Sequence, residues 1–354
     1  MEGCGKRISI NGRQIGRDRP PFVIAEMSGN HNRSLERALS IVDAAAESGA
    51  HALKLQTYTA DTMTLDLNSD DFTIRDPESL WHGQTLYSLY EKASTPWEWH
   101  GPIMERCQER GLLCFSTPFD DSAVDFLEEL RVPAYKIASF EIVDLELIRR
   151  VAATGKPLLI SMGMATLAEL DDAVRAAREA GNNDIILLQC TSCYPASPAD
   201  SNLLTIPHLQ DIFGLPVGLS DHTRGIGTAV AAVALGAVVV EKHFTLSRDD
   251  GGVDAEFSLE PAEFALLVIE TERAWQALGR ISCGPTANEM ASLKFRRSLY
   301  VVQDLQAGDV LTAENVRRIR PGFGLPPKYY AALLGRRVAR DVKRGTPLTW
   351  QLLA

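Results

Sequence analysis

Two histidines close two consecutive apolar segments of the sequence and are the residues best suited to metal chemistry. His222 ends the segment 218–222, His243 ends the segment 238–243, and the Ala/Val-rich stretch 225–236 between them is long enough for one buried helix. A strand–helix–strand unit makes its two strands parallel neighbours, so both imidazoles emerge at one edge of a sheet. Such a pair is the protein half of a divalent-metal site with open positions for a substrate. The alternative is that each histidine only caps its strand through hydrogen bonds.

Around this unit the sequence alternates between short apolar segments and amphipathic or alanine-rich ones. The predicted strands span residues 22–26, 51–56, 112–116, 134–138, 157–161, 185–190, 216–220 and 237–241. The predicted helices span residues 35–48, 96–110, 122–130, 145–153, 167–180, 202–213, 226–235 and 261–278. Eight strands that alternate with eight helices predict an α/β fold, a (β/α)8 TIM barrel rather than an open sheet.

The polar residues of the predicted strands fall on a single phase. In a barrel strand every second side chain points inward, and enzymes of this fold keep their active sites at the C-terminal ends of the strands. The inward sets are Ile24/Glu26, Ala52/Lys54/Gln56, Phe115/Thr117, Ala134/Lys136, Leu159/Ser161, Leu188/Cys190/Ser192, Gly218/Ser220/His222 and Val239/Glu241/His243. Each set is apolar or small at its start and polar at its end, which predicts a chemically active barrel mouth. Lys242 falls on the outward phase and is left out of the predicted chemistry.

Cations and hydroxyl groups are predicted to converge at this mouth. They suit an anion with more than one charged group, such as a phosphate beside a carboxylate. Glu26 is placed to act as general acid or base on a carbonyl or a water, or else to pair with a lysine. Asp254, in the acidic loop after the eighth strand, either reaches the metal or a substrate hydroxyl or is solvated. The predicted anion-binding residues are Lys54, Thr117, Lys136, Ser161, Ser192 and Ser220.

The composition limits the classes of protein to which this sequence can belong. The chain has 354 residues, of which 45% are hydrophobic and 23% charged, as in an ordinary globular protein. Its net charge of −10 argues against a nucleic-acid partner. It has neither a run of 18 apolar residues nor a signal-peptide pattern, so we expect a cytoplasmic protein without a membrane partner. The six cysteines lack disulfide-framework spacing, and one isolated CxxC, Cys190 to Cys193, does not indicate zinc or redox chemistry.

Three regions are predicted along the chain. Residues 1–283 form the barrel domain with an N-terminal β-hairpin over 8–15, where Asn11-Gly12 lies between apolar runs. A connection from Thr57 to Thr95 is unusually long and contains aromatic residues, so we expect a loop that shapes the substrate pocket. Residues 284–297 form a linker with a polar helix over 288–296, and residues 298–354 form a small all-β domain. Its predicted strands span 298–302, 316–319, 336–339 and 347–350.

Several motifs, taken in order, resemble the sialic acid synthase family over essentially the whole chain. The C-terminal part is similar to the antifreeze-like (SAF, β-clip) domain of that family. Within the family, the segments 26–32, 56–63 and 80–83 most resemble those of pseudaminic acid synthases. The motifs are Ala25 to Asn32, Lys54 to Thr57, Ser116 to Phe119, Tyr135 to Ser139, Cys190 to Pro195, Gly218 to Thr223 and Glu241 to Thr245.

The resemblance implies that phosphoenolpyruvate condenses with an N-acetylated amino sugar and that phosphate is released by C–O cleavage. His222 and His243 would hold a divalent ion, Mn²⁺ or else Mg²⁺ or Co²⁺. Glu26, Lys136 and Asp254 would be catalytic. The residues that would contact the two substrates are Lys54, Gln56, Thr117, Ser139, Glu141, Ser161, Ser192, Tyr194 and Ser220. Ser192 stands where several relatives carry Asn. The resemblance also implies a domain-swapped homodimer, in which Arg320 of one subunit contacts the sugar in its partner.

The expected product is pseudaminic acid, made from a 2,4-diacetamido-2,4,6-trideoxy hexose of the altrose type. Sialic or legionaminic acid synthesis from mannosamine-type acceptors is the alternative. A class II aldolase would share the barrel and the metal, and a Schiff-base aldolase would use Lys136 or Lys54. The last hypothesis is of another class: the C-terminal domain would be an independent glycan- or ice-binding module beside an inert barrel.

Overall fold

The computed structural model describes residues 6–354 and divides into two compact units, the first ending at Gly279 and the second beginning at Arg280. Each unit has its own hydrophobic core, so each is described by itself. Of the cysteines, Cys4 lies outside the described residues, and the other five are free thiols. Among the described residues, no helix has the length and apolar character needed to cross a membrane.

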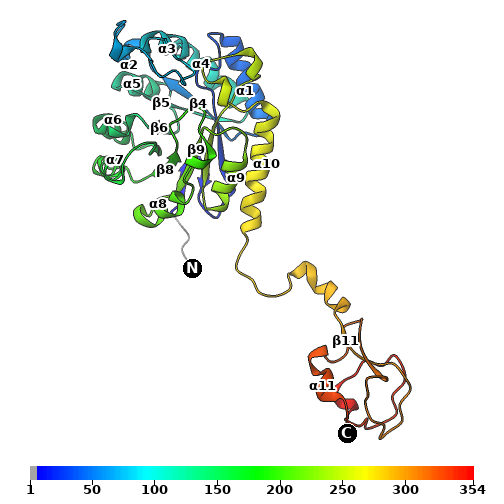
Figure 1. Ribbon diagram of the computed structural model, residues 1–354. Coiled ribbons are helices and arrows are strands. Elements are labelled where there is room, and N and C mark those ends of the chain that lie inside the picture. The colour runs from blue at the N-terminus through cyan, green and yellow to red at the C-terminus, as the bar shows by residue number, and fades with distance from the viewer. Residues whose placement is uncertain (1–5) are drawn as a thin grey trace. The chain divides into compact units, whose positions relative to one another are not determined.

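The first unit is built on a closed barrel of eight parallel strands, visible in Figure 1 inside a ring of helices. The chain passes from each strand to its neighbour, and β10 closes the barrel against β3. This confirms the predicted TIM-barrel fold, with strand ends that differ by one or two residues. The strands are β3 (Phe22–Glu26), β4 (Ala52–Thr57), β5 (Leu113–Pro118), β6 (Tyr135–Ile137), β7 (Leu158–Ser161), β8 (Ile185–Cys190), β9 (Val217–Asp221) and β10 (Val239–His243).

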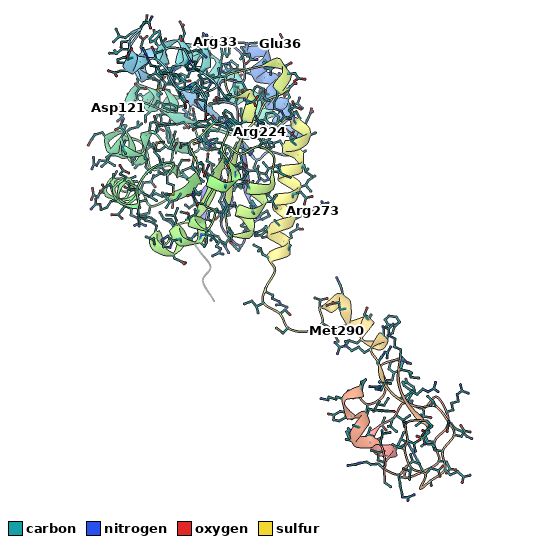
Figure 2. The ribbon with its side chains drawn as sticks, viewed as in Figure 1. Arg33, Glu36, Asp121, Arg224, Arg273 and Met290 are labelled. Atoms are coloured by element: carbon teal, nitrogen blue, oxygen red, sulfur yellow. The ribbon has the colours of Figure 1, made fainter. Side chains whose placement is uncertain are left out.

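Eight helices surround the barrel, and all eight were predicted, the largest shift being at the start of α8. Several begin where a side chain caps the free backbone N–H groups, as Ser34, Asp120 and Thr166 do. The polar faces of the helices lie outward, as Arg273 on α10 shows in Figure 2 with 68% of its side chain exposed. The helices are α1 (Leu35–Glu47), α4 (Trp97–Glu109), α5 (Asp121–Glu129), α6 (Leu145–Ala152), α7 (Leu167–Glu179), α8 (Thr205–Phe213), α9 (Gly227–Ala234) and α10 (Pro261–Leu278).

The predicted N-terminal hairpin is present as β1 (Ile8–Ile10) and β2 (Arg13–Ile15). Asn11 and Gly12 both have positive φ, 46° and 84°, which is the backbone of a tight two-residue hairpin turn. Ile8, Ile10 and Ile15 are buried and belong to the barrel's hydrophobic core, so the hairpin is part of the first unit.

The long connection between β4 and α4 contains more regular structure than the sequence suggested. It carries α2 (Ala60–Met63), a 3-10 turn (Asp70–Phe72) and α3 (Leu86–Ala93). Leu89 and Ala93 of α3 are buried, so this segment is packed rather than loose. Short 3-10 turns follow other strands of the barrel, at Glu141–Val143, Pro198–Asp200, Arg248–Asp250 and Ala255–Phe257.

The second unit is less β-rich than predicted. Its two strands, β11 (Ser298–Val301) and β12 (Val316–Ile319), pair antiparallel. The predicted strands 336–339 and 347–350 are wrong, because Arg337, Val338 and Pro347 make only isolated bridges. The predicted linker helix is instead a 3-10 helix with no buried residue. The helical elements are that 3-10 helix (Ala287–Phe295), α11 (Tyr330–Leu333) and the turns Pro327–Tyr329 and Trp350–Leu352.

Candidate active site

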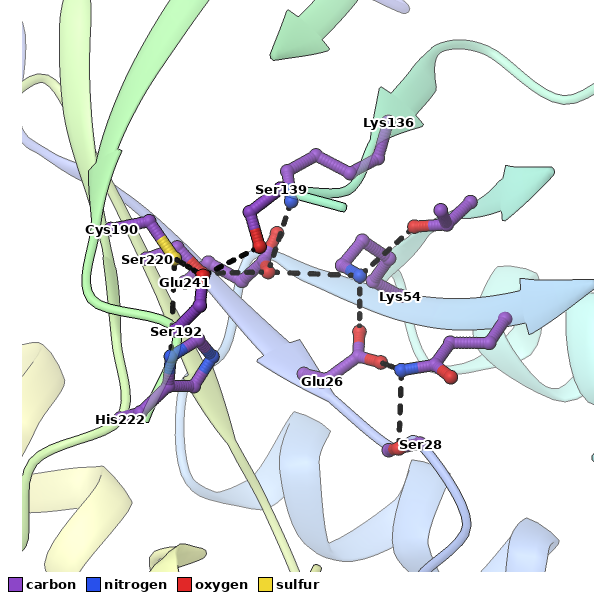
Figure 3. Close-up of polar contacts among 12 residues, drawn as sticks. Glu26, Ser28, Lys54, Lys136, Ser139, Cys190, Ser192, Ser220, His222 and Glu241 are labelled. Atoms are coloured by element: carbon purple, nitrogen blue, oxygen red, sulfur yellow. Dashed lines mark hydrogen bonds and ion pairs between the residues drawn. The ribbon is translucent and has the colours of Figure 1, made fainter. Parts of the chain in front are cut away.

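Four charged side chains from four strands meet at the mouth of the barrel. The Lys54 ammonium lies 2.8 Å from Glu26 Oε2 and 3.6 Å from Glu241 Oε1. The Lys136 ammonium lies 3.5 Å from the same Glu241 oxygen. Figure 3 shows both lysines turned toward Glu241, with Glu26 on the other side of Lys54. Lys54 also donates a hydrogen bond of 3.1 Å to Thr117. The inward phase read from the sequence therefore brings these side chains together.

The burial of this group is costly. Glu26, Lys54, Lys136 and Glu241 are each at most 4% exposed. Removing an ion from water costs several kcal/mol even after relaxation, and mutual attraction offsets this only with good geometry. Two carboxylates and two ammonium groups cancel formally, but apolar residues would fill a barrel at lower cost. The buried group is therefore a candidate for chemistry rather than for stability.

Burial shifts the pKa values of two side chains of this group, Glu26 and Lys136, in the direction that favours their neutral forms. Burial raises the pKa of Glu26, and the pairing with Lys54 only partly opposes the shift. Burial likewise lowers the pKa of Lys136. Lys54 differs, because the attraction of Glu241 and Glu26 outweighs burial and raises its pKa. A carboxyl group whose pKa lies above its usual range can carry a proton to or from a substrate.

Hydroxyl groups line the side of the mouth next to Lys136. The Ser139 and Ser192 hydroxyls are 2.7 Å apart, and Ser220 donates a bond of 3.1 Å to Glu241. The Ser161 hydroxyl is buried and has no hydrogen-bond partner. Gly163 makes room for the cluster, since a Cβ there would lie 2.3 Å from the Ser139 Cβ. A buried donor without a partner beside a lysine is suited to an anion.

The two predicted metal-site histidines lie side by side, with ring centroids 5.3 Å apart. His222 Nδ1 lies 2.9 Å from the Thr191 carbonyl, which assigns the proton to Nδ1 and leaves Nε2 free to bind a metal. Burial, with neighbouring cations, holds the pKa of His243 well below its usual value, so the ring is neutral. His243 Nδ1 is buried without a hydrogen-bond partner. The two rings thus fit a metal site whose other positions belong to substrate or water.

Further protein ligands for an ion are limited. The nearest carboxylate oxygen to His243 Nδ1 is that of Asp254, at 3.7 Å. Among residues 6–354, no group of three or more His, Cys, Asp or Glu side chains is arranged to hold a metal ion. The donor set is therefore the histidine pair, with Asp254 beside it.

Asp254 is part of a hydrogen-bonded chain that reaches Glu26. Gln56 donates to Glu26 Oε1 at 2.9 Å and to the Ser28 hydroxyl at 3.1 Å, and Ser28 donates to Asp254. Asp254 is only 8% exposed, so the alternative of a solvated acidic loop is wrong. Burial raises its pKa to about 6. This series of hydrogen bonds links Asp254, which lies beside His243, with Glu26, which lies beside Lys54.

An aromatic wall, made of Trp81, Tyr194 and Phe257, stands beside the histidines. The Tyr194 ring lies 4.5 Å from His222 and 5.3 Å from Phe257, centroid to centroid. Phe257 in turn lies 4.8 Å from His243. Trp81 extends the wall, 6.0 Å from Tyr194, and its indole N–H donates to the Val253 carbonyl at 3.0 Å. The long connection thus reaches the barrel mouth.

Two predicted site residues make no hydrogen bond or ion pair with this cluster among the described contacts. Glu141 lies in the turn after β6, half-buried, with one carboxylate oxygen unpaired. Burial raises its pKa to about 7. Arg320 lies in the second unit and is exposed there. Lys242 faces away from the mouth, as its phase predicted, and pairs with Asp221.

Sequence reasoning missed several residues of the site. Glu241 was placed on the inward phase but given no role, although it stands two residues before His243 on the same strand. Ser28 and Phe257 lie in loops, where no periodicity marks them. Trp81 belonged to the connection expected to shape the pocket, without being singled out.

Comparison with known proteins agrees with this architecture. The NeuB family model matches residues 41–282 and the SAF domain model residues 296–354. A pseudaminic acid synthase of Campylobacter jejuni is 44% identical over 338 residues, 95% of this chain and 98% of that protein. An N,N'-diacetyllegionaminic acid synthase of Legionella pneumophila is 36% identical over 355 residues, 98% of this chain and 99% of that one. The N-acetylneuraminic acid synthetase of Leptospira borgpetersenii, solved with citrate, has a TM-score of 0.73 at 34% identity, covering 84% of this chain and 98% of that chain.

The fold and the mouth define a (β/α)8-barrel enzyme followed by a SAF domain. The family match covers well over half of the chain, and the relatives match nearly all of it. The chain belongs to the NeuB family, which confirms the resemblance read from its motifs.

Proposed function

We propose that this enzyme condenses phosphoenolpyruvate with a 2,4-diacetamido-2,4,6-trideoxy hexose of the altrose type to give pseudaminic acid and phosphate. The observation that carries the proposal is the buried pair of lysines beside a cluster of hydroxyl groups, of which Ser161 is unpaired, next to the two imidazoles. The 44% identity to a pseudaminic acid synthase over most of both chains supports the choice of product.

In the proposed complex, phosphoenolpyruvate lies against Lys54, Lys136 and the hydroxyls of Thr117, Ser139, Ser161, Ser192 and Ser220. Both lysines already pair with Glu241, so a doubly anionic ligand enters a site whose amino groups are held in place. Charge-assisted hydrogen bonds from ammonium groups to phosphate or carboxylate are about twice as strong as neutral ones. Binding of the donor therefore needs little rearrangement of this side of the mouth.

In the proposed reaction, the C2–C3 π electrons of phosphoenolpyruvate form a C–C bond to the sugar aldehyde carbon, and the aldehyde oxygen takes a proton. Water adds to the cationic C2 and loses a proton. The C2–O bond to phosphate then breaks as the new C2 hydroxyl becomes the ketone C=O, and the hydroxyl proton passes to the departing phosphate. Glu26 is the group we assign to the proton transfers, because burial raises its pKa and Gln56 fixes its orientation. Asp254 and Gln56 would orient the sugar.

His222 and His243 would hold the divalent ion, Mn²⁺ or else Mg²⁺ or Co²⁺. When bound, such an ion supplies Lewis-acid polarisation of a carbonyl oxygen. The support is the buried, unpaired Nδ1 of His243 and the hydrogen bond that fixes the tautomer of His222.

The aromatic wall supports an acceptor with apolar substituents. The Tyr194 ring lies beside His222, and the Trp81 ring lies against Tyr194, so a 6-deoxy methyl or an acetamido methyl group placed against these rings would be desolvated. One methylene-sized group in an apolar pocket contributes about 1–3 kcal/mol to discrimination. An acceptor with a hydroxymethyl group, as in N-acetylmannosamine, would place a hydroxyl against these rings. Legionaminic acid synthesis, from a diacetamido sugar of the mannose type, remains the second candidate because of the 36% identity to such an enzyme.

The test is phosphate release from phosphoenolpyruvate with three acceptors: diacetamido-trideoxyaltrose, diacetamido-trideoxymannose and N-acetylmannosamine. We expect the highest kcat/KM with the altrose compound, and loss of turnover with chelator that added Mn²⁺ restores. Release of phosphate without an acceptor would contradict a condensation. A class II aldolase would release none, and a Schiff-base aldolase would give a covalent adduct at Lys136 or Lys54 with borohydride.

We further propose that a homodimer forms in which Arg320 of one subunit contacts the sugar bound to the other. Two observations within the second unit support a docking role. Arg320 is exposed, and Phe323 three residues later is 66% exposed. Ser298 holds the segment between them by donating to the Pro321 carbonyl at 2.7 Å. Sedimentation should give a mass of two chains, and a monomer would exclude this arrangement.

The cytoplasm is the compartment we propose for the reaction. The five described cysteines are free thiols, as expected in a reducing compartment. Cell fractionation that finds the protein outside the cytoplasm would refute this assignment.

A further inference from the structure

Lys242 and Asp221 form an ion pair on the outer side of the barrel, in the positions next to the two histidines. Lys242 precedes His243 on β10, Asp221 is the last residue of β9 and directly precedes His222, and Lys242 and Asp221 are register partners. Their ammonium nitrogen and carboxylate oxygen are 2.7 Å apart, and the side chains are 0% and 1% exposed. The pair therefore connects the C-terminal ends of β9 and β10 on the outer side of the barrel, opposite to the histidine side chains.

The pair also holds the backbone on both sides of His222. Asp221 Oδ1 accepts hydrogen bonds from the Thr223 backbone N–H at 2.9 Å and from its hydroxyl at 2.7 Å. The Lys242 ammonium donates to the Thr223 carbonyl as well as to Asp221. The carbonyl of His222 itself accepts from the Ala196 N–H at 3.0 Å. His222 is thus fixed by its neighbours, while its ring faces the mouth.

Stability alone does not account for a buried ion pair at this place. Replacing such a pair with well-packed residues of similar volume is often neutral or stabilising, whereas removing one partner is strongly destabilising. What a pair of opposite charges does supply is a fixed register between two elements. Groups that orient metal-binding histidines typically change metal affinity by about 10–100-fold when they are removed.

We propose that Lys242 and Asp221 are positioning residues that set the separation of His222 and His243 and thereby the affinity for a divalent ion. This inference rests on the proposed metal site, and it assigns a task to a lysine that faces away from the chemistry. The Lys242–Asp221 pair acts on the metal only through the two strands.

The experiment is a titration of the full chain, freed of metal, with Mn²⁺, followed by electron paramagnetic resonance without substrates. The test variant is the double substitution Lys242→Met/Asp221→Asn, which leaves no unpaired charge. We expect about 10-fold or weaker Mn²⁺ binding, with cooperative thermal unfolding retained. The matched control is Lys156→Met/Glu128→Gln, which neutralises an ion pair between α5 and the segment before β7 and should leave Mn²⁺ affinity unchanged.

The outcomes separate the inference from the proposed function. Wild-type Mn²⁺ affinity in the double variant would overturn the positioning role while leaving the metal site standing. A wild-type chain that binds no Mn²⁺ but releases phosphate would overturn both the metal site and this inference. If the double variant loses its unfolding transition, Thr223→Val takes its place, since it removes the 2.7 Å bond to Asp221 and keeps both charges. Several-fold weaker Mn²⁺ binding then supports the inference, and unchanged binding overturns it.

Discussion

Glu141 allows a stability prediction whose size follows from the structure. Burial raises the pKa of this carboxyl group from its usual 4.5 to about 7. One pKa unit corresponds to about 1.4 kcal/mol, so the raised pKa is equivalent to about 3.5 kcal/mol at full effect. Because the folded pKa is the raised one, this contribution is fully present below pH 4.5 and is lost as the pH rises through 7. Between pH 4.5 and about 7, the folded protein keeps the proton on Glu141 that the unfolded chain releases.

The perturbation is Glu141→Gln, which keeps the shape of the neutral acid and cannot ionise. The free energy of unfolding of wild type and variant is measured by denaturant titration at pH 5 and pH 8. Relative to wild type, the variant should gain about 2 to 3 kcal/mol between these two pH values. Subtracting the wild-type free energy of unfolding from that of the variant at each pH cancels the contributions of the other titrating groups, which the two proteins share. Two stability curves that run parallel with pH would refute the argument, because Glu141 would then ionise as it does in the unfolded chain.

Three further predictions concern the site. Glu26→Gln should reduce kcat by ~10²-fold or more, as for a lost general acid or base, while calorimetry still detects phosphoenolpyruvate binding; an unchanged kcat would exclude the assigned role. Gly163→Ala should raise the KM for phosphoenolpyruvate by about tenfold, equal to ~1.4 kcal/mol, because the added Cβ meets Ser139. The control is Gly155→Ala, which also lies at positive φ but whose Cβ would have nothing within 4 Å, and it should leave this KM unchanged. Arg320→Ala should raise the KM of the sugar by about tenfold, as for a lost charged hydrogen bond, and more than that of phosphoenolpyruvate; the reverse order would place Arg320 elsewhere.

The barrel and much of its mouth could be predicted because their determinants are local. Alternation along each strand decides which side chains face inward, and a parallel barrel places all strand ends at one rim. Glu26, Lys54 and Lys136 follow from this rule without knowledge of any long-range contact. The same rule put Lys242 outside, where the structure has it.

The remaining features depend on interactions that no local pattern records. Which acid pairs with which lysine is decided by distances across the barrel, so the central place of Glu241 between Lys54 and Lys136 was not predicted. Asp254 is buried where it accepts a hydrogen bond from Ser28, which lies 226 residues away in the chain. In the second unit, short pieces separated by turns leave Val338 and Pro347 with single bridges instead of ladders.

The alternation on β10 has a consequence for how this protein can change. Glu241, Lys242 and His243 follow one another and face inside, outside and inside: Glu241 toward the lysines, Lys242 toward Asp221 and His243 toward His222. A single inserted or deleted residue would move every following side chain to the other face. Insertions and deletions should therefore be tolerated better in the exposed connections than in the strands. Libraries aimed at new acceptor sugars would do best to vary loop length and leave strand length untouched.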